Sequence, residues 1–286
     1  MSKGFYHVSS QGLEKNDIFK THQDFIQGVN DIAICVLGFD VIILAFCLMS
    51  NHFHFVLYGT LEQCRMFAEA YKRMCAIRMR NIAGDVKGLI AVEIQIDNLD
   101  SQEYLENAIA YVLRNPLAAG LLIMPFHYPW SSIQTYFRGD LKPVGKRLGD
   151  LSVRAKRHIL HSRQNVPDTY IVDEQGMISP SCFVDTSKVE EIFRHPARLM
   201  MGIARKVEMD VEVRLGLQNS IGITDQELLT QMNELVKLEF GKSSFYGLSI
   251  EDRLKLCSLL KRNFGAGAKQ IARVTRLSPE IVAKIV

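Results

Sequence analysis

The chain has 286 residues, of which 48% are apolar and 23% are charged, and its formal net charge is +3 with a pI near 8.5. A chain of this length and composition can bury one good-sized core and a smaller second one, which excludes an intrinsically disordered protein. The mild positive charge permits a nucleic-acid partner without requiring one. After residue 150, Lys and Arg outnumber Asp and Glu by 20 to 16, so the basic character is concentrated in the C-terminal half.

The cysteines and the apolar runs indicate a reducing, aqueous compartment. None of the six cysteines has CxxC spacing, and most have apolar neighbours, which is typical of buried thiols rather than of a zinc site or a disulfide framework. The N-terminus lacks the apolar stretch of a signal peptide, and the longest apolar run, residues 41–49, is too short to span a bilayer. We therefore expect a cytoplasmic protein with no membrane partner.

The first 115 residues alternate between strand-like and helix-like periodicity. The predicted elements are a strand at 5–11, a helix at 18–37, strands at 41–49 and 52–59, a helix at 61–81, a strand at 89–96 and a helix at 101–115. Ser50 and Asn51 link the two middle strands as an antiparallel hairpin, and the last helix stops before Pro116. This order predicts an α+β domain on the ferredoxin-like βαββαβ plan, with an antiparallel sheet and helices packed on one face.

The remainder predicts a basic connector at 141–200, with a small hairpin at 170–184 and a helix from about Lys188, and then a mostly helical domain at 201–286. The segment AKQIARVTRLSPEIVAKIV (268–286) has the length and apolar spacing of a helix-turn-helix. The residues expected in its core are Ile271, Ala272, Leu277, Ile281 and Val282. Ser278 and Pro279 would open its second helix. An ordinary helical hairpin with basic decoration fits the composition equally well.

A His-x-His pair lies in the second strand of the predicted hairpin. Side chains two residues apart on a strand share a face, so His52 and His54 stand side by side while Phe53 and Phe55 point to the other face. Two such imidazoles can bind one divalent cation. The same spacing also fits two histidines that are satisfied by hydrogen bonds on a half-exposed sheet.

The segment around this pair resembles a known family. CLMSNHFHFVLYG (47–59) is similar to the signature of the single-tyrosine HUH transposases, in particular the REP-associated branch, where a strand ending in Met-Pro-Asn-His presents the histidines. Ser50 stands here at the usual proline position, a change in the turn that should cost little. YHVSSQGLEKNDIF (6–19) also resembles the first strand and loop of that family. The resemblance makes residues 1–140 the catalytic domain.

A second segment resembles the other half of the family signature. AYVLRNPLAAGL (110–121), followed by YPWSSIQTY (128–136), is similar to the family's tyrosine helix. Helical residues at i and i+4 share a face, so Tyr111 and Asn115 would project together. Taken alone, the pair also fits a core tyrosine and a helix C-cap. Tyr104 and Tyr136 are nearby alternatives for a nucleophile, but neither precedes an Asn-Pro step by one turn.

The resemblance implies a metal-dependent tyrosine transposase. Tyr111 would be the catalytic nucleophile, and His52, His54 and Asn115 would bind Mg²⁺ or Mn²⁺. The substrate would be single-stranded or hairpin DNA, nicked and transferred through a 5′-phosphotyrosine link with a free 3′-OH. Two alternatives remain open: a catalytically silent DNA-binding protein derived from such a transposase, and a metal-dependent nuclease that uses water. A homodimer also remains open.

Basic side chains on the predicted helices are candidates for contacts with DNA phosphates, although a solvated helix face explains each of them as well. In the first domain they are Arg65, Lys72, Arg73, Arg78, Arg80 and Arg114; at the C-terminus they are Lys269, Arg273, Arg276 and Lys284. One segment departs from the family pattern. Relatives carry a basic aromatic Phe-x-x-Arg-Tyr segment before the fourth strand, whereas residues 85–97 keep only Lys87 and gain Glu93 and Asp97.

Overall fold

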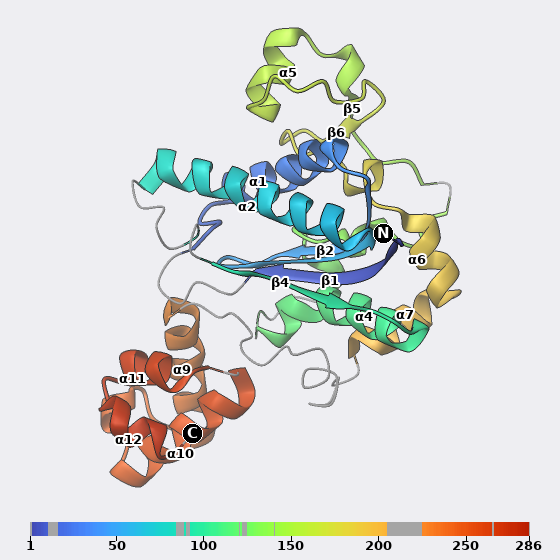
Figure 1. Cartoon of the computed structure of the whole chain (residues 1–286). Helices are drawn as coiled ribbons and strands as arrows, with labels where there is room; N and C mark the ends of the chain where they lie inside the picture. Colours follow the sequence, from blue (N-terminus) through green and yellow to red (C-terminus); the bar gives the residue numbers. More distant parts are fainter. Residues whose placement is uncertain are drawn as a thin grey trace.

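The N-terminal half builds a four-stranded antiparallel sheet in an α+β fold (Figure 1). A computed structural model describes residues 2–10, 17–83, 89, 92–119, 121, 125–139, 141–204, 225–264 and 266–285. The strands are β1 (Gly4–Ser10), β2 (Val41–Leu48), β3 (Phe53–Gly59) and β4 (Ile94–Asn98). Their spatial order is β2-β3-β1-β4, so β1 and β3 are the inner strands.

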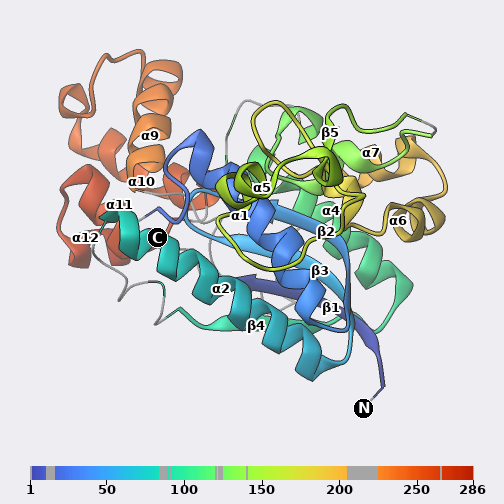
Figure 2. The same ribbon diagram turned by 90° about the horizontal axis from the view of Figure 1, so that it is seen from above.

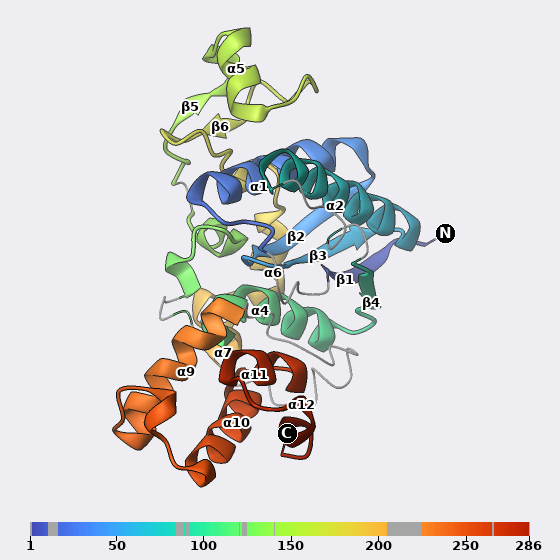
Figure 3. The same ribbon diagram turned by 90° about the vertical axis from the view of Figure 1, so that its left-hand side faces the viewer.

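Helices cover both faces of this sheet (Figure 3). The helices α1 (His22–Cys35) and α2 (Leu61–Ala83) lie on one face, and α4 (Gln102–Ala118) lies on the other. Successive side chains of β3 point to opposite faces of the sheet. The Phe55 ring packs against Phe67 and Tyr71 of α2 at centroid distances of 5.3 Å, whereas the side chain of the preceding residue, His54, points toward Tyr111 of α4. The predicted separation of the phenylalanines from the histidine is confirmed.

Several predicted boundaries shift in the structure. The helix predicted at 18–37 begins only at His22, behind a Thr21 capping box. β4 begins at Ile94 because its pairing with β1 starts at Ser10. The prediction that the last helix stops before Pro116 is wrong, since α4 continues to Ala118. Proline there removes one backbone donor only, and the Ala119 amide donates to the Asn115 carbonyl at 2.9 Å.

The segment after α4 covers the outer edge of β2. The amide of Leu48 donates to the Trp130 carbonyl at 2.9 Å, and the Tyr128 hydroxyl donates to the Leu48 carbonyl at 2.7 Å. Farther along, the Tyr136 hydroxyl donates to the Leu44 carbonyl at 2.6 Å. These bonds occupy groups that an uncovered edge strand would leave to water.

A small module lies over α1 (Figure 2). It comprises β5 (Lys146–Arg147), α5 (Val153–Leu160) and β6 (Ile171–Val172), so the segment predicted as a connector carries its own structure. Its core joins Leu148, Leu160 and Ile178 to Ala33 and Ile34 of α1.

The helices that follow return to the sheet. They are α6 (Thr186–Phe193) and α7 (Pro196–Ala204). α7 packs on α4, where Arg198 forms an ion pair with Glu106 at 2.7 Å. The tyrosine helix is therefore held between the sheet and α7.

The C-terminal helices enclose a separate hydrophobic core. They are α9 (Asp225–Phe240), α10 (Ile250–Phe264), α11 (Ala268–Thr275) and α12 (Pro279–Ala283). The predicted core positions Ile271, Ala272 and Val282 are buried, but Ile281 is 48% exposed because only Val282 of the five-residue α12 faces inward. Residues 205–224, part of the stretch predicted as helical, lie outside the described residues. No helix among the described residues is both long and apolar enough to cross a membrane.

Candidate active site between the sheet and α4

The structure brings the four residues predicted for catalysis and metal binding together beneath the sheet. The rings of His52 and His54 are perpendicular, with centroids 4.8 Å apart. The Tyr111 ring stands edge-on to His54 at 5.6 Å. Asn115, one turn later on α4, has its side chain close enough to His54 to influence the pKa of that histidine. Residues more than fifty positions apart in the sequence thus share one site.

The site is buried, which keeps His54 neutral. His52, His54 and Asn115 are at most 4% exposed, and Tyr111 is half-buried. Burial lowers the pKa of His54 well below its usual value; the neighbouring His52 and His7 lower it further, while Asn115 acts in the opposite direction. A neutral imidazole is the form that binds a metal ion.

Local hydrogen bonds orient the polar atoms of the site. Asn51 places Oδ1 2.8 Å from Nδ1 of His52. Since a carbonyl oxygen only accepts, Nδ1 is the donor of this bond, and in a neutral ring Nε2 of His52 then carries the lone pair. Asn115 donates Nδ2 to the Tyr111 carbonyl at 3.0 Å, which leaves its Oδ1 as the acceptor atom of the amide. Both arrangements suit residues that present lone pairs to a cation.

His7 is a site residue that the sequence reasoning missed. It is completely buried in β1, and its Nε2 lies 3.2 Å from Nδ1 of His54. Its ring also meets the edge of Tyr111 at 5.8 Å, and its Nδ1 lies 3.5 Å from Oδ2 of Asp97. A lone histidine in a strand has no motif; only the β1–β3 register, which pairs Ser9 with His54, makes His7 its diagonal neighbour.

The polar atoms of this site are suited to bind a metal ion. Nε2 of His54 is a buried atom with no hydrogen-bond partner of good geometry within the described part of the chain. An orphaned imidazole nitrogen beside a second histidine and an amide fits a divalent cation that keeps open positions for substrate oxygens. The described residues contain no group of three or more His, Cys, Asp or Glu side chains placed to hold a metal, so a cation bound here would also need the Asn115 amide.

Of the two alternative tyrosines, Tyr136 is excluded by its environment. Its hydroxyl is shared with Ser132 at 2.7 Å and with the Leu44 carbonyl, and burial raises its pKa. Tyr104 is half-buried two turns before Tyr111 on α4.

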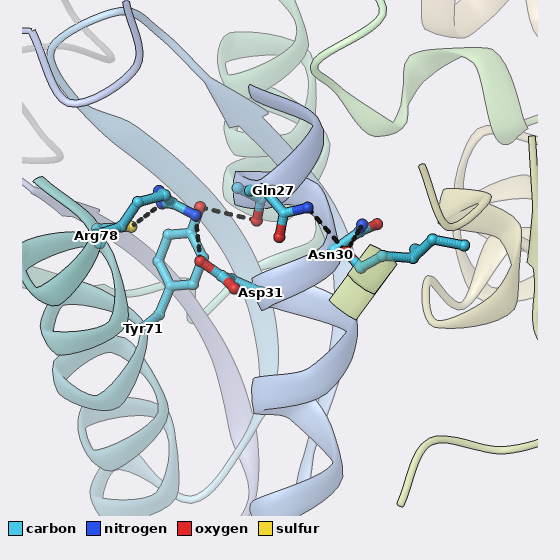
Figure 4. A network of polar contacts seen from close by, with 8 residues as sticks. Gln27, Asn30, Asp31, Tyr71 and Arg78 are labelled. Atoms are coloured by element: carbon cyan, nitrogen blue, oxygen red, sulfur yellow. Dashed lines mark hydrogen bonds and ion pairs between the residues drawn. The ribbon is translucent and has the colours of Figure 1, made fainter. Parts of the chain in front are cut away.

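Two of the predicted DNA contacts on α2 are structural instead. Lys72 is buried and donates Nζ to the Val92 carbonyl at 2.9 Å, because the helix turns this side toward the strand approaching β4. Arg78 forms an ion pair with Asp31 of α1 (Figure 4). Its guanidinium also lies over the Phe19 ring. Neither cation is available to a phosphate, so both predictions are wrong.

The other predicted contacts differ in accessibility. Arg65 and Arg73 are exposed, Arg114 is half-buried, and the side chain of Arg80 lies outside the described residues. At the C-terminus the exposed candidates are Lys269, Arg276 and Lys284. Arg273 is engaged by both carboxyl oxygens of Asp225 at 2.8 and 3.0 Å, so it too is a structural residue.

Comparison with known proteins adds little to this picture. No family model and no curated protein matches the chain. One solved structure, a REP-associated tyrosine transposase bound to a REP hairpin, is 12% identical; the match covers 49% of this chain and 82% of that one with a TM-score of 0.37. A similarity this low indicates at most a distant relation and carries no weight for the function of this chain.

Proposed function

We propose that this protein nicks single-stranded or hairpin DNA and transfers a strand through a covalent link to Tyr111. The observation that carries the proposal is the convergence of Tyr111 and Asn115 of α4 on the buried histidines of β3, with the tyrosine ring edge-on to His54 at 5.6 Å. Buried polar groups normally have hydrogen-bond partners, because leaving them unpaired costs stability. A buried cluster of imidazoles beside a half-buried phenol is therefore not explained by packing alone.

Each residue of the site has a distinct task in this chemistry. His52, His54 and Asn115 would hold Mg²⁺ or Mn²⁺, and a bound cation would supply polarisation of the scissile phosphate and stabilisation of transition-state charge. The Tyr111 oxygen gives its proton to water and attacks phosphorus; the Tyr–O–P bond forms as the bond to the 3′-oxygen breaks, and that oxygen takes a proton from water and leaves as a 3′-OH. In the second step a 3′-OH attacks the phosphotyrosine, which rejoins the DNA and releases Tyr111. Because the histidines are almost fully buried, DNA access requires an outward movement at α4 or its neighbours.

The arrangement of the first domain supports its assignment to the ferredoxin-like plan. The chain order β1, α1, β2, β3, α2, β4 and the spatial order β2-β3-β1-β4 are what that plan requires, with α1 and α2 on one face.

For the C-terminal helices we propose a DNA-binding role of the helix-turn-helix kind. α12 begins at Pro279 directly after Ser278, as predicted, and Lys269, Arg276 and Lys284 are exposed and could contact phosphates.

The test is a covalent adduct. Labelled hairpin-bearing single strands are incubated with Mn²⁺ and the full chain, and DNA-linked protein is resolved on a denaturing gel. We expect the adduct with the natural protein and with Tyr104→Phe, a matched control on the same helix, but not with Tyr111→Phe. An adduct that persists in Tyr111→Phe would remove this residue from the mechanism.

The same gel separates the alternatives. Cleavage without an adduct indicates hydrolysis by water, and binding without cleavage indicates a silent DNA-binding protein. The altered segment 85–97 is the observation that favours the silent alternative, because its basic aromatic element is absent.

A further inference from the structure

We infer that His7 and Asp97 are positioning residues that fix the ring and the proton of His54, so that Nε2 of His54 faces the reaction site without a proton. The inference deepens the proposed function and depends on it for the role of His54. It gives a role to His7, which belongs to no sequence motif, and to Asp97, which departs from the family pattern of residues 85–97.

The three side chains form a row across three neighbouring strands. Asp97 lies on β4, His7 on β1 and His54 on β3, and β1 is hydrogen-bonded to both other strands. Asp97 is the cross-strand partner of His7, and its Oδ2 lies 3.5 Å from Nδ1 of His7. On the far side of the same ring, Nε2 lies 3.2 Å from Nδ1 of His54. The two imidazoles are nearly parallel, with an interplanar angle of 18°.

The order of donors and acceptors along this row determines where the protons lie. A carboxylate oxygen can only accept, so the charge of Asp97, whose Oδ2 lies 3.5 Å from Nδ1 of His7 but outside hydrogen-bond geometry, favours a proton on that nitrogen. A neutral imidazole has one proton, and Nε2 of His7 then becomes an acceptor. The facing atom, Nδ1 of His54, must therefore be the donor, which leaves Nε2 of His54 with its lone pair. This is the arrangement by which an outer group orients a metal-binding histidine.

One neighbour works against this arrangement. The Asn115 oxygen would favour a proton on Nε2 of His54 if the two atoms were hydrogen-bonded. The Asn115 side chain is near enough to raise the pKa of His54, but among the described residues it does not meet full hydrogen-bond geometry with Nε2 of His54, whereas the His7–His54 contact at 3.2 Å does, so the structure favours His7. The opposite tautomer would also set two acceptors, Nδ1 of His7 and Oδ2 of Asp97, against each other.

The tautomer is measurable in the metal-free protein by long-range ¹H–¹⁵N NMR of ¹⁵N-histidine-labelled chain. We expect His54 to be protonated at Nδ1 in the natural protein and to shift toward a mixture in Asp97→Ala. Asp97→Asn keeps one acceptor oxygen and should restore the natural state. The matched control is Glu93→Ala, which removes an exposed acid from the same segment. Protonation of His54 at Nε2 in the natural protein overturns the inference.

A second readout is Mn²⁺ affinity, followed by electron paramagnetic resonance without DNA. Loss of an outer-shell partner weakens metal binding by about 10- to 100-fold, which we expect for Asp97→Ala and His7→Leu but not for Glu93→Ala. His7→Gln retains an acceptor near the position of Nε2 and should recover most of the affinity.

If His7 merely fills space, His7→Leu leaves the His54 tautomer unchanged, and the inference fails. If His7→Leu does not fold, the Asp97 variants decide, since Asp97 is on the edge strand and partly exposed. The NMR result needs neither metal nor DNA. A missing Tyr111 adduct with an Nδ1-protonated His54 therefore refutes the proposed catalysis alone.

Discussion

Replacing Arg78 by Met should destabilise the fold and should not act through DNA. The side chains of Arg78 and Asp31 are only 15% and 12% exposed, and they face each other between α1 and α2 (Figure 4). Removing one member of a fully buried ion pair costs about 3–5 kcal/mol, because the other charge remains buried without a partner. Met preserves the apolar contact with Phe19, and the residual exposure softens the loss, so we expect about 3 kcal/mol.

The assay is urea unfolding followed by fluorescence of Trp130, the chain's single tryptophan. This residue stacks on Phe25 of α1 at 4.9 Å and therefore reports on the helix that carries Asp31. Arg73→Met, an exposed change on the same helix, should cost less than about 0.5 kcal/mol. The double variant Asp31→Leu with Arg78→Met should recover most of the stability, since an apolar pair has no charge to bury.

The pKa of Asp31 determines how the stability loss in Arg78→Met depends on pH. Burial raises the pKa of Asp31, although Arg78 pulls it down. A raised carboxyl pKa means that the folded state binds the proton more tightly, so stability falls as pH rises through that pKa. Without Arg78 the pKa rises further, and the loss in Arg78→Met should be largest at neutral pH and shrink on acidification. An unchanged urea midpoint combined with weaker DNA binding would refute this reasoning and return Arg78 to the DNA surface.

Three further changes test other parts of the fold. Lys72→Met should cost about 1–3 kcal/mol in urea unfolding, because the Val92 carbonyl loses its buried donor, and should leave the salt dependence of DNA binding unchanged. Asn30→Leu should lower the midpoint of thermal unfolding, because the Asn30 side chain donates to the Gly176 carbonyl at 2.9 Å and accepts from the Ile178 amide at 2.8 Å in the small module. An unchanged midpoint contradicts this. Gly145→Ala places a Cβ 2.1 Å from the Val172 carbonyl oxygen, so the β6 amides should exchange hydrogen faster.

Local patterns predicted much of this structure, for reasons visible at particular residues. The two-residue period of β3 separates Phe55 from His54, and the four-residue spacing on α4 brings Tyr111 and Asn115 to the same buried site. Both are properties of one continuous segment, so the sequence contains them completely. The distance between the two segments is a tertiary property, and family resemblance rather than periodicity suggested it.

The cations of α2 show where local reasoning stops. The charges of Lys72 and Arg78 suggest a solvated face, but Lys72 comes four residues after Ala68 and Arg78 seven residues after Tyr71, so helical spacing puts both on the buried side of α2. Arg78 pairs with Asp31 of α1, 47 residues away, and Lys72 donates to the Val92 carbonyl, 20 residues away, in addition to its ion pair with Glu69 one turn earlier on α2. A charged side chain enters the interior when a fixed partner meets it there, and no periodicity reveals a partner on another element.

Asp97 departs from the family pattern, yet its position in the fold suits a role at the site. In the sequence it is an acid where basic and aromatic residues are expected, which argues against a grip on DNA. In the fold it is the cross-strand partner of His7, 3.5 Å from a buried imidazole that itself contacts His54. An acid at this position repels phosphate from the surface, but it also places a carboxylate beside Nδ1 of His7, where we infer that it orients the histidine row. The two effects have different signatures: substituting Asp97 should change metal affinity and the His54 tautomer, whereas an effect through the DNA surface alone would change only the salt dependence of binding.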